Sequence, residues 1–587
     1  MRPARTASAI DAVAEGYLSA AVSLSPITAT ALGLPGADDQ LDDFSPEGLA
    51  AAADLDRATL RRLAGAEPVD DIDRVTLEAM RERLGVAVER HEAGVPHMSL
   101  NVLECPLQAV RDVLDLMPTD TPQQWEVVAD RMAAIPAALT QWHDSLLYAR
   151  SRGLVASRRQ VLACIAQAEG FASADGYFGT LLERERAARH PVPEAVAVRV
   201  ERAATTARAG YAACAARLRD DLLAVAPQAD ACGRELYALH SRYFLGSRID
   251  LAETYAWGVD ELARVRDRMR QLAGRIAPDA ATGGGTDAQT LVWAARERLD
   301  TDERYRLRGT EALVAWMQEQ TDRAVAALAP VHFDIPEPLR RIECRVAPTQ
   351  TGGIYYTGPS DDLSRPGMMW WSVPRGVTTF STWQELTTVY HEGVPGHHLQ
   401  IGQTVLNSGQ LNRWRRLLSW TSGHGEGWAL YAEQLMAELG FLDDPGNRLG
   451  MLDAQSLRAA RVVIDIGVHC GFDMPAQDGG GPWSYDTAWR LLRSASLLPE
   501  EILRFELDRY LGWPGQAAAY KVGERLWRSL RDEVATAQGA AFDLREFHRR
   551  ALDIGGVGLD TLRQAVLGRW EAADGPRATA ESSEAVS

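Results

Sequence analysis

Apolar residues recur every three or four positions along most of this chain. This spacing places them on one face of a helix, so it predicts amphipathic helices. The clearest stripe lies in the segment 251–276 and consists of Leu251, Tyr255, Val259, Leu262, Val265, Met269, Leu272 and Ile276. Similar stretches near 70–92, 122–152, 192–224, 309–328 and 498–537 predict further helices. Pro278 and the glycine-rich run 282–286 predict a loop after the 251–276 helix.

The segment 340–376 departs from the helical pattern. Ile342, Cys344 and Val346 alternate with polar residues, and two further apolar runs follow at 354–356 and 368–373. Alternation with period two predicts two or three short strands. One interpretation is a small structural sheet. The other is a strand edge beside a cleft, which could pair with an extended peptide.

These patterns predict a mainly α fold of many helices with a small antiparallel β-sheet. We expect a helical N-terminal region over 1–335 and a region carrying the candidate chemistry over 336–572. Residues 573–587 are small and polar, which predicts a disordered tail. No repeat of fixed period is present, so a solenoid is not favoured.

Composition narrows the class of protein. The 587 residues include 62 basic and 80 acidic side chains, giving a net charge of −18, which disfavours binding to nucleic acid or to anionic membranes. No apolar run approaches the ~20 residues of a spanning helix. Asp11 and Glu15 interrupt any secretion-signal pattern. The six cysteines lack paired spacing, which predicts reduced thiols and a cytoplasmic protein.

Three of the twelve histidines fall in the eight-residue segment His391-Glu392-Gly393-Val394-Pro395-Gly396-His397-His398. A histidine followed by glutamate, a second histidine and a later glutamate is the pattern of many zinc hydrolases. Neutral imidazoles and a carboxylate can hold Zn²⁺ and leave one position for water. Glu392, next to a candidate ligand, is placed to act as the general base.

The histidine spacing is unusual for such a site. Two ligating histidines normally lie four residues apart, but that position is Pro395. On a regular helix His391 and His397 would point about 120° apart, and His391 and His398 would lie ~10 Å apart along the axis. We expect a local bulge that loops out two residues and restores His397 as the second ligand. The alternative is a helix that ends here, leaving the histidines solvated.

Glu426 is the candidate third ligand. It lies 29 residues beyond His397, near the start of a predicted helix with a glycine-rich approach. The alternative is an acidic residue in a helix's first turn, where the helix dipole favours it. His424 is a weaker candidate ligand.

Two C-terminal segments carry possible helpers. Arg461, Asp465 and His469 are four residues apart, so they share a helical face. His469 could donate to a developing oxyanion or bind substrate, with Asp465 orienting it; the alternative is a buried polar ladder.

The other segment surrounds Pro514, which we expect to be the first residue of a helix. Tyr520 on that helix could stabilise an oxyanion, or only pack. Arg509 and Lys521 could bind a substrate carboxylate. Several tryptophans near these segments could line a cleft, although a core position is commoner; they are Trp370, Trp371, Trp420, Trp428 and Trp513.

Four sequence blocks in this order resemble the bacterial family known as domain of unknown function 885. They are HEGVPGHHLQ (391–400), EGWALYAEQL (426–435), RAARVVIDIGVH (458–469) and RYLGWPGQAAAYKVGE (509–524). The resemblance implies a mainly helical fold similar to metallopeptidases of the thermostable-carboxypeptidase type, and a zinc site. The family pattern varies at His398, which favours His397 as the ligand. The stretch 470–484 looks longer than in many members and would reshape the substrate cleft.

The sequence therefore predicts a zinc-dependent hydrolase acting on an amide bond of a short peptide or peptide-like small molecule. We expect His391, His397 and Glu426 to bind the metal and Glu392 to serve as base, with His469, Tyr520 and Arg509 as helpers. Mn²⁺ or Co²⁺ could replace Zn²⁺ at such ligands. The alternatives are an enzyme of small-molecule metabolism with a non-peptide substrate, and a noncatalytic binding protein with a vestigial site.

Overall fold

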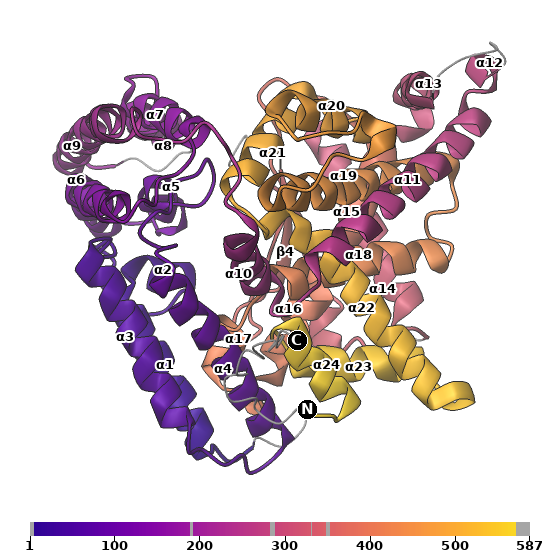
Figure 1. The fold of residues 1–587 in the computed structure, drawn as a ribbon, viewed down its shortest axis with the longest axis horizontal. Coiled ribbons are helices and arrows are strands. Elements are labelled where there is room, and N and C mark those ends of the chain that lie inside the picture. Colours follow the sequence, from indigo (N-terminus) through magenta and orange to yellow (C-terminus); the bar gives the residue numbers. More distant parts are fainter. Residues whose placement is uncertain (1–4, 188–191, 282–287, 330, 348–352, 571–587) are drawn as a thin grey trace, which may run out of the picture.

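The computed structural model describes residues 5–187, 192–281, 288–329, 331–347 and 353–570, and it is mainly helical (Figure 1). The helices up to residue 328 are α1 (Ala9–Leu24), α2 (Pro26–Ala31), α3 (Pro46–Leu63), α4 (Asp71–Glu92), α5 (Pro106–Asp112), α6 (Pro122–Ser151), α7 (Arg158–Ala172), α8 (Tyr177–Ala187), α9 (Glu194–Arg217), α10 (Arg234–Leu245), α11 (Leu251–Ile276), α12 (Pro278–Ala281), α13 (Ala288–Thr301) and α14 (Thr310–Leu328). Those that follow are α15 (Thr382–Glu392), α16 (His397–Leu406), α17 (Arg413–Leu417), α18 (Ser422–Glu438), α19 (Pro445–Cys470), α20 (Tyr485–Ala495), α21 (Glu500–Gly512), α22 (Gln516–Gln538), α23 (Leu544–Ile554) and α24 (Leu559–Leu567). The predicted loop at 282–286 and the predicted tail at 573–587 lie outside the described residues.

The apolar pattern predicted most long helices well. The stripe over 251–276 is α11, and α4, α6, α9 and α14 occupy the other predicted stretches up to residue 328. The stretch 498–537 is the exception, because it forms two helices, α21 and α22. Gly515 has a φ of 81°, which an ordinary residue rarely adopts, and α22 begins at Gln516 rather than at Pro514.

Five short strands form two small sheets. They are β1 (Arg306–Arg308), β2 (Ile342–Val346), β3 (Ile354–Thr357), β4 (Gly367–Trp371) and β5 (Thr379–Ser381). The strands β1 and β5 pair antiparallel. The other sheet has the order β2-β4-β3, with β3 antiparallel to β4 and β2 parallel to it. The expected antiparallel pairing thus holds for two of the three strand pairs, and the three-stranded sheet is mixed.

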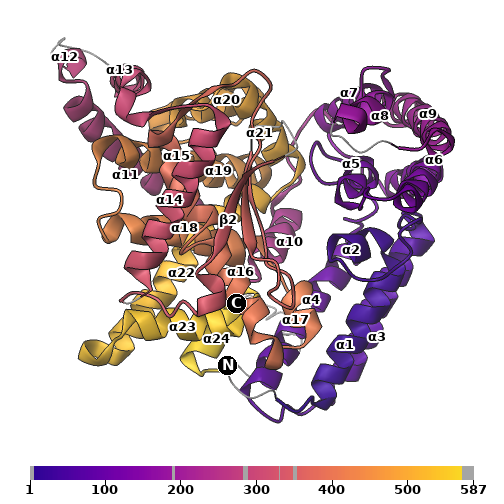
Figure 2. The ribbon, with the colours of Figure 1, turned by 180° about the vertical axis from the view of Figure 1, so that it is seen from behind.

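One large hydrophobic core joins the two expected regions. It extends from Ile10 in α1 to Val566 in α24 and includes buried residues of α11, α18 and α22. A second core lies mainly within α5–α9, which form a lobe beside the rest of the chain (Figures 1 and 2). The region 1–335 therefore contributes both a separate lobe and part of the main core. All six cysteines carry free thiols, as their spacing predicted.

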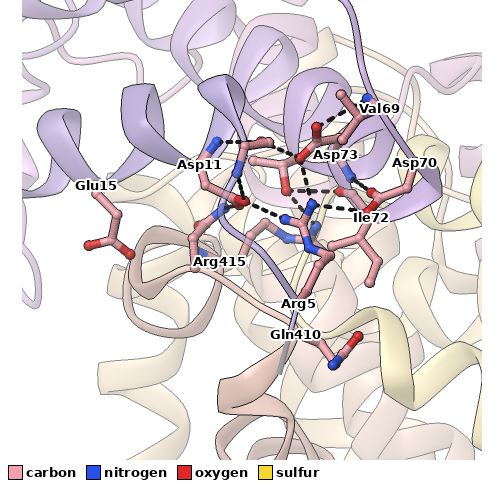
Figure 3. A network of polar contacts seen from close by, with 12 residues as sticks. Arg5, Asp11, Glu15, Val69, Asp70, Ile72, Asp73, Gln410 and Arg415 are labelled. Atoms are coloured by element: carbon pink, nitrogen blue, oxygen red, sulfur yellow. Dashed lines mark hydrogen bonds and ion pairs between the residues drawn. The ribbon is translucent and has the colours of Figure 1, made fainter. Parts of the chain in front are cut away.

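A buried polar network attaches the start of the chain to the C-terminal half (Figure 3). The Arg5 guanidinium contacts Asp11 at 2.6 Å, Asp73 at 3.0 Å and Asp70 at 3.1 Å. Asn412, which caps α17, donates to Asp11 at 2.9 Å. Burial opposes ionisation of Asp73, but hydrogen bonds from Ser8, the Val69 backbone and Arg5 outweigh it and lower its pKa.

Replacing Asp73 should therefore destabilise the fold in a pH-dependent way. Because the folded pKa of Asp73 is depressed, its contribution is present above about pH 4 and is lost as pH falls further. We expect Asp73→Asn to lower the free energy of unfolding by about 1–3 kcal/mol at pH 7, measured by denaturant titration. Asp70→Asn is the matched control, since it contacts the same arginine from an exposed position and asparagine also caps helices. Equal effects of the two variants would contradict this account.

Candidate metal centre

The chain between the two histidines leaves the helix and then resumes it. The helix α15 ends at Glu392 and α16 begins at His397. The Gly396 N–H donates to the Tyr390 carbonyl at 3.1 Å, a bond that residue 394 would make in a regular helix. The two extra residues therefore form a loop, as the spacing predicted. The loop lies between two helices, however, and not inside a single helix. A Cβ on Gly396 would lie 1.9 Å from the His391 carbonyl oxygen, so the loop needs glycine there.

Trp428 of α18 fixes this loop from the core side. Its indole N–H points at the carbonyls of Pro395 at 2.9 Å and Gly396 at 3.3 Å. The Trp428 side chain is fully buried, and it also packs against Trp527 with 5.0 Å between ring centroids. Trp428 is therefore a core residue that supports the site rather than a lining residue.

The structure brings the four central predicted residues together. The rings of His391 and His397 are perpendicular, with centroids 4.9 Å apart. Glu426 Oε2 lies 3.3 Å from His391 Nε2 and 3.6 Å from His397 Nε2. Potential ligand atoms of His391, Glu392 and His397 also lie within 4.8 Å of one another. Two imidazoles and two carboxylates from α15, α16 and α18 therefore converge.

A second carboxylate orients His391. Glu433 Oε1 lies 2.8 Å from His391 Nδ1, and the Thr387 hydroxyl donates to Glu433 Oε2 at 2.6 Å. The Nδ1–H then donates to Glu433, which leaves Nε2 facing Glu426. Ligating histidines usually have such a carboxylate partner, which fixes the tautomer. Glu433 is not among the site residues predicted from the sequence; the signal for it there is its position seven residues after Glu426, on the same helical face.

The buried charges of the cluster depend on one another. Burial opposes protonation of His391, but hydrogen bonds with Glu426 and Glu433 outweigh it and raise its pKa to about 10. Burial likewise opposes ionisation of Glu426, yet the two histidines lower its pKa. A metal would take the place of the His391 proton, so metal binding would release that proton.

The residues present fit a divalent metal such as zinc. The donor set of two imidazole nitrogens and a carboxylate oxygen is one that zinc uses in catalytic sites. His397 Nδ1 is buried and has no hydrogen bond to the described residues. Trp420, whose side chain is 43% exposed, lies beside that ring with 6.4 Å between centroids. Glu426 is itself 21% exposed, so the cluster is reachable from solvent on its side.

Glu392 differs from the other members of the cluster. Its carboxylate makes no hydrogen bond within the described part of the chain, and burial is the main cause that raises its pKa. A carboxylate that is close to the ligand atoms and is not held by a protein partner can hold a water molecule and accept its proton.

Tyr520 and two arginines lie beside the cluster. The Tyr520 pKa is raised chiefly by burial and further by the nearby Glu426 carboxylate. The Arg461 guanidinium lies over the Tyr520 ring, 4.8 Å from its centroid. Glu506 accepts hydrogen bonds from Arg461 at 2.7 Å and Arg509 at 3.0 Å. Two guanidinium groups thus share one carboxylate, and the N–H groups at Arg461 Nη1 and Arg509 Nε have no hydrogen bond to described residues.

A close crossing of two helices places Tyr520 there. A Cβ on Gly427 of α18 would lie 2.5 Å from the Gly523 carbonyl carbon of α22, and one on Gly523 would lie 2.2 Å from the Gly423 carbonyl oxygen. Glycine lets the two backbones approach to this distance. Glu426 precedes Gly427, and Tyr520 lies one turn before Gly523, so the crossing brings both side chains to one place.

The structure corrects the expectation for His469, because it places this residue in a buried polar ladder instead of at the cluster. The Cys232 N–H donates to its Nδ1 at 3.2 Å, and its Nε2–H donates to the Tyr510 carbonyl at 3.0 Å. Asp465 accepts from the Tyr237 hydroxyl at 3.0 Å and from the backbone N–H of Gly515 at 3.0 Å. Both ring nitrogens of His469 are therefore engaged by backbone, and Asp465 supports the start of α22.

Lys521 is likewise engaged in the interior. Its ammonium contacts Glu524 at 2.6 Å and Glu261 at 3.1 Å, and it also donates to Gln455. The side chain is 1% exposed. Lys521 therefore neutralises buried carboxylates and is not available to a substrate. This corrects the prediction that Lys521, together with Arg509, binds a substrate carboxylate.

The two other histidines near the motif have structural partners. His398 Nε2 lies 2.9 Å from the Leu339 carbonyl and Nδ1 lies 2.9 Å from the Tyr356 hydroxyl, which ties α16 to the sheet. His424 Nδ1 lies 3.1 Å from the Gln400 amide nitrogen. Neither joins the cluster of His391, Glu392, His397 and Glu426.

The stretch 470–484 lies against α11. Asp478 pairs with Arg266 at 2.9 Å, and the Tyr255 hydroxyl donates to the Asp473 carbonyl at 2.7 Å. Through these contacts the stretch 470–484 packs against α11 and not against the metal cluster.

The fold and the cluster define a mainly helical protein with a candidate metal centre. The chain belongs to the DUF885 family of bacterial proteins of unknown function, whose family model matches residues 26–566. A search of curated proteins found no match.

Two solved structures share the fold over nearly the whole chain. One, from Colwellia psychrerythraea and described as a "putative lipoprotein", has a TM-score of 0.80 and 22% identity, covering 95% of this chain and 98% of its own. The other, from Shewanella oneidensis and described as a "putative lipoprotein of unknown function", has a TM-score of 0.72 and 17% identity, covering 96% of this chain and 100% of its own. Within the described residues, no helix combines the length and apolar character needed to cross a membrane.

The orienting role of Glu433 predicts an effect on metal affinity. We expect Glu433→Gln to weaken zinc binding by about 10–100-fold, measured by competition with a chelating dye, because His391 loses the partner that fixes its tautomer. Glu438→Gln is the matched control on the same helix, since Glu438 is 45% exposed and pairs with Arg531 at 3.1 Å. Unchanged zinc affinity in Glu433→Gln would contradict the assigned geometry.

Proposed function

We propose that this protein is a zinc-dependent hydrolase that cleaves an amide bond in a short peptide or peptide-like small molecule. The observation that carries the proposal is the position of Glu426 Oε2, 3.3 and 3.6 Å from the Nε2 atoms of His391 and His397. Glu392, whose carboxylate has no hydrogen bond to a described residue, lies beside these atoms. Ligands and base are thus separate groups in one cluster.

Each residue has a distinct part in this proposal. A zinc ion held by His391, His397 and Glu426 would acidify a water molecule and polarise the substrate carbonyl. Glu392 accepts the proton of the attacking water and passes it to the leaving nitrogen. Glu433 and Thr387 hold the His391 ring in place. The Tyr520 hydroxyl, which has no hydrogen bond within the described residues, donates to the oxygen that gains negative charge.

Arg461 and Arg509 supply a positive site beside the reacting groups. Their two charges face the single carboxylate of Glu506, and burial, which would raise the Glu506 pKa, is outweighed by the arginines, which lower it to about 2. The two unpartnered guanidinium N–H positions suit a carboxylate of the substrate. The sequence predicted that Arg509 and Lys521 bind a substrate carboxylate. In this proposal Arg461 replaces Lys521 in that role.

The role of Glu392 is tested by removing its basicity while keeping its shape. We expect Glu392→Gln to lower kcat for a cleaved peptide by about 10²–10⁴-fold and to retain zinc, because the lost group acts on the proton and not as a ligand. The measurements are steady-state kinetics and elemental analysis, with Glu438→Gln as control. A zinc-loaded protein that cleaves no member of a short-peptide and small-amide library would refute the proposal.

The arginine site predicts selectivity for a free carboxylate. We expect peptides with a free C-terminus to be cleaved with a kcat/KM at least about tenfold above that of their C-terminal amides. Arg509→Gln should remove this preference by raising KM for the free acids alone. Arg504→Gln, on the exposed side of the same helix, is the control. Equal cleavage of acids and amides by the unaltered protein would reject this assignment while leaving the hydrolase proposal standing.

A further inference from the structure

A cavity with both polar and apolar lining residues lies away from the metal cluster, at the junction of the α5–α9 lobe and the main core. Its volume is about 120 Å³. It is lined by residues of α4, α7 and α10, by the loop 227–232 and by the turn between α21 and α22. In this measure, ~10–15 Å³ is enough to hold one water molecule, so the space holds several waters or one small organic molecule.

Three lining side chains leave polar atoms unpartnered within the described residues. They are Arg90 Nε, His240 Nδ1 and Gln160 Oε1, from three different helices. His240 and Gln160 are 7% and 2% exposed. Buried polar atoms in folded proteins nearly always have a partner, so unpartnered polar groups on three residues that line one space favour a polar occupant there.

His240 is the most unusual of the three. Neither of its ring nitrogens makes a hydrogen bond to a described residue, and burial, with Arg90 and His469 adding to the effect, lowers its pKa to about 3. Its imidazole is therefore neutral and offers one donor and one acceptor to the cavity. Gln160 is fixed on the other side, because its amide nitrogen donates to the Asp508 carbonyl at 2.7 Å.

Arg90 determines the charge of the occupant. Its guanidinium lies over the Tyr243 ring, 3.6 Å from the centroid, and forms no ion pair with a carboxylate in the described ranges. Water could satisfy its hydrogen bonds, but it would not neutralise the charge. Asp230, the carboxylate that lines the cavity, already accepts from Ser157 at 2.9 Å and Arg159 at 3.2 Å.

We propose that this cavity is a binding site for a small free amino acid. Its carboxylate pairs with Arg90, and its ammonium donates to the remaining lone pairs of Asp230. His240 donates one further hydrogen bond to the carboxylate. This site does not depend on the proposed hydrolase activity.

Three probes that differ by one group test the assignment on the full-length protein. L-Alanine carries both charged groups, propionate lacks the ammonium and ethylammonium lacks the carboxylate. By isothermal titration calorimetry, L-alanine should bind with one site per chain and propionate at least about tenfold more weakly. Ethylammonium should not bind. Failure of L-alanine to bind, or equal binding of L-alanine and ethylammonium, overturns the proposal.

Variants place the binding in this cavity. Arg90→Gln should weaken L-alanine binding at least about tenfold. Arg83→Gln is the matched control, because Arg83 contacts the same Tyr243 ring at 5.7 Å and does not line the cavity. His240→Phe keeps a planar ring and removes no hydrogen bond to a described residue, so it should fold and still lose affinity. Binding that survives both cavity variants, or that is lost in His391→Ala at the metal centre, also overturns it.

Discussion

The candidate metal centre depends on one displaced hydrogen bond. Because Gly396, and not residue 394, donates to the Tyr390 carbonyl, the connection between α15 and α16 contains two extra residues. His397 is thereby set against His391 with the two rings perpendicular, which the six-residue spacing would forbid on a continuous helix. Trp428 holds the carbonyls of the loop, so the geometry of the site is supported from the core.

Charge balance is the second constraint on this region. Buried cations on the helices α19, α21 and α22 pair with buried carboxylates, but the ratio of the two charges differs between sites. Lys521 faces both Glu524 and Glu261, whereas Arg461 and Arg509 share the single carboxylate of Glu506 among the residues that the structure describes. A buried charge without compensation is costly, so this excess of positive charge beside the candidate metal centre would suit an anionic ligand.

The sequence predicted the helices and the central cluster because both are local signals. The apolar stripe of period 3.6 predicted the full length of α11. The histidine and glutamate motif predicted that His391, Glu392 and His397 lie in one cluster. Tertiary partners carry no such signal. His469 shares a helical face with Asp465, which suggested a catalytic pair, but the backbone of Cys232 and Tyr510 engages both its nitrogens. Lys521 lies in the same motif as Tyr520, yet its ammonium forms an ion pair with Glu261, which lies 260 positions earlier in the chain.

The break between α21 and α22 links the two sites described above. Amphipathic periodicity continues across it, so the pattern alone predicted one helix, whereas Gly515 turns the chain with a positive φ. On one side of this turn, Trp513 and Pro514 line the cavity that contains His240. On the other side, Asp465 accepts the Gly515 N–H and fixes the start of α22, which carries Tyr520 toward Glu426. A ligand in the cavity would therefore contact the segment that positions Tyr520, and the two sites share one structural support.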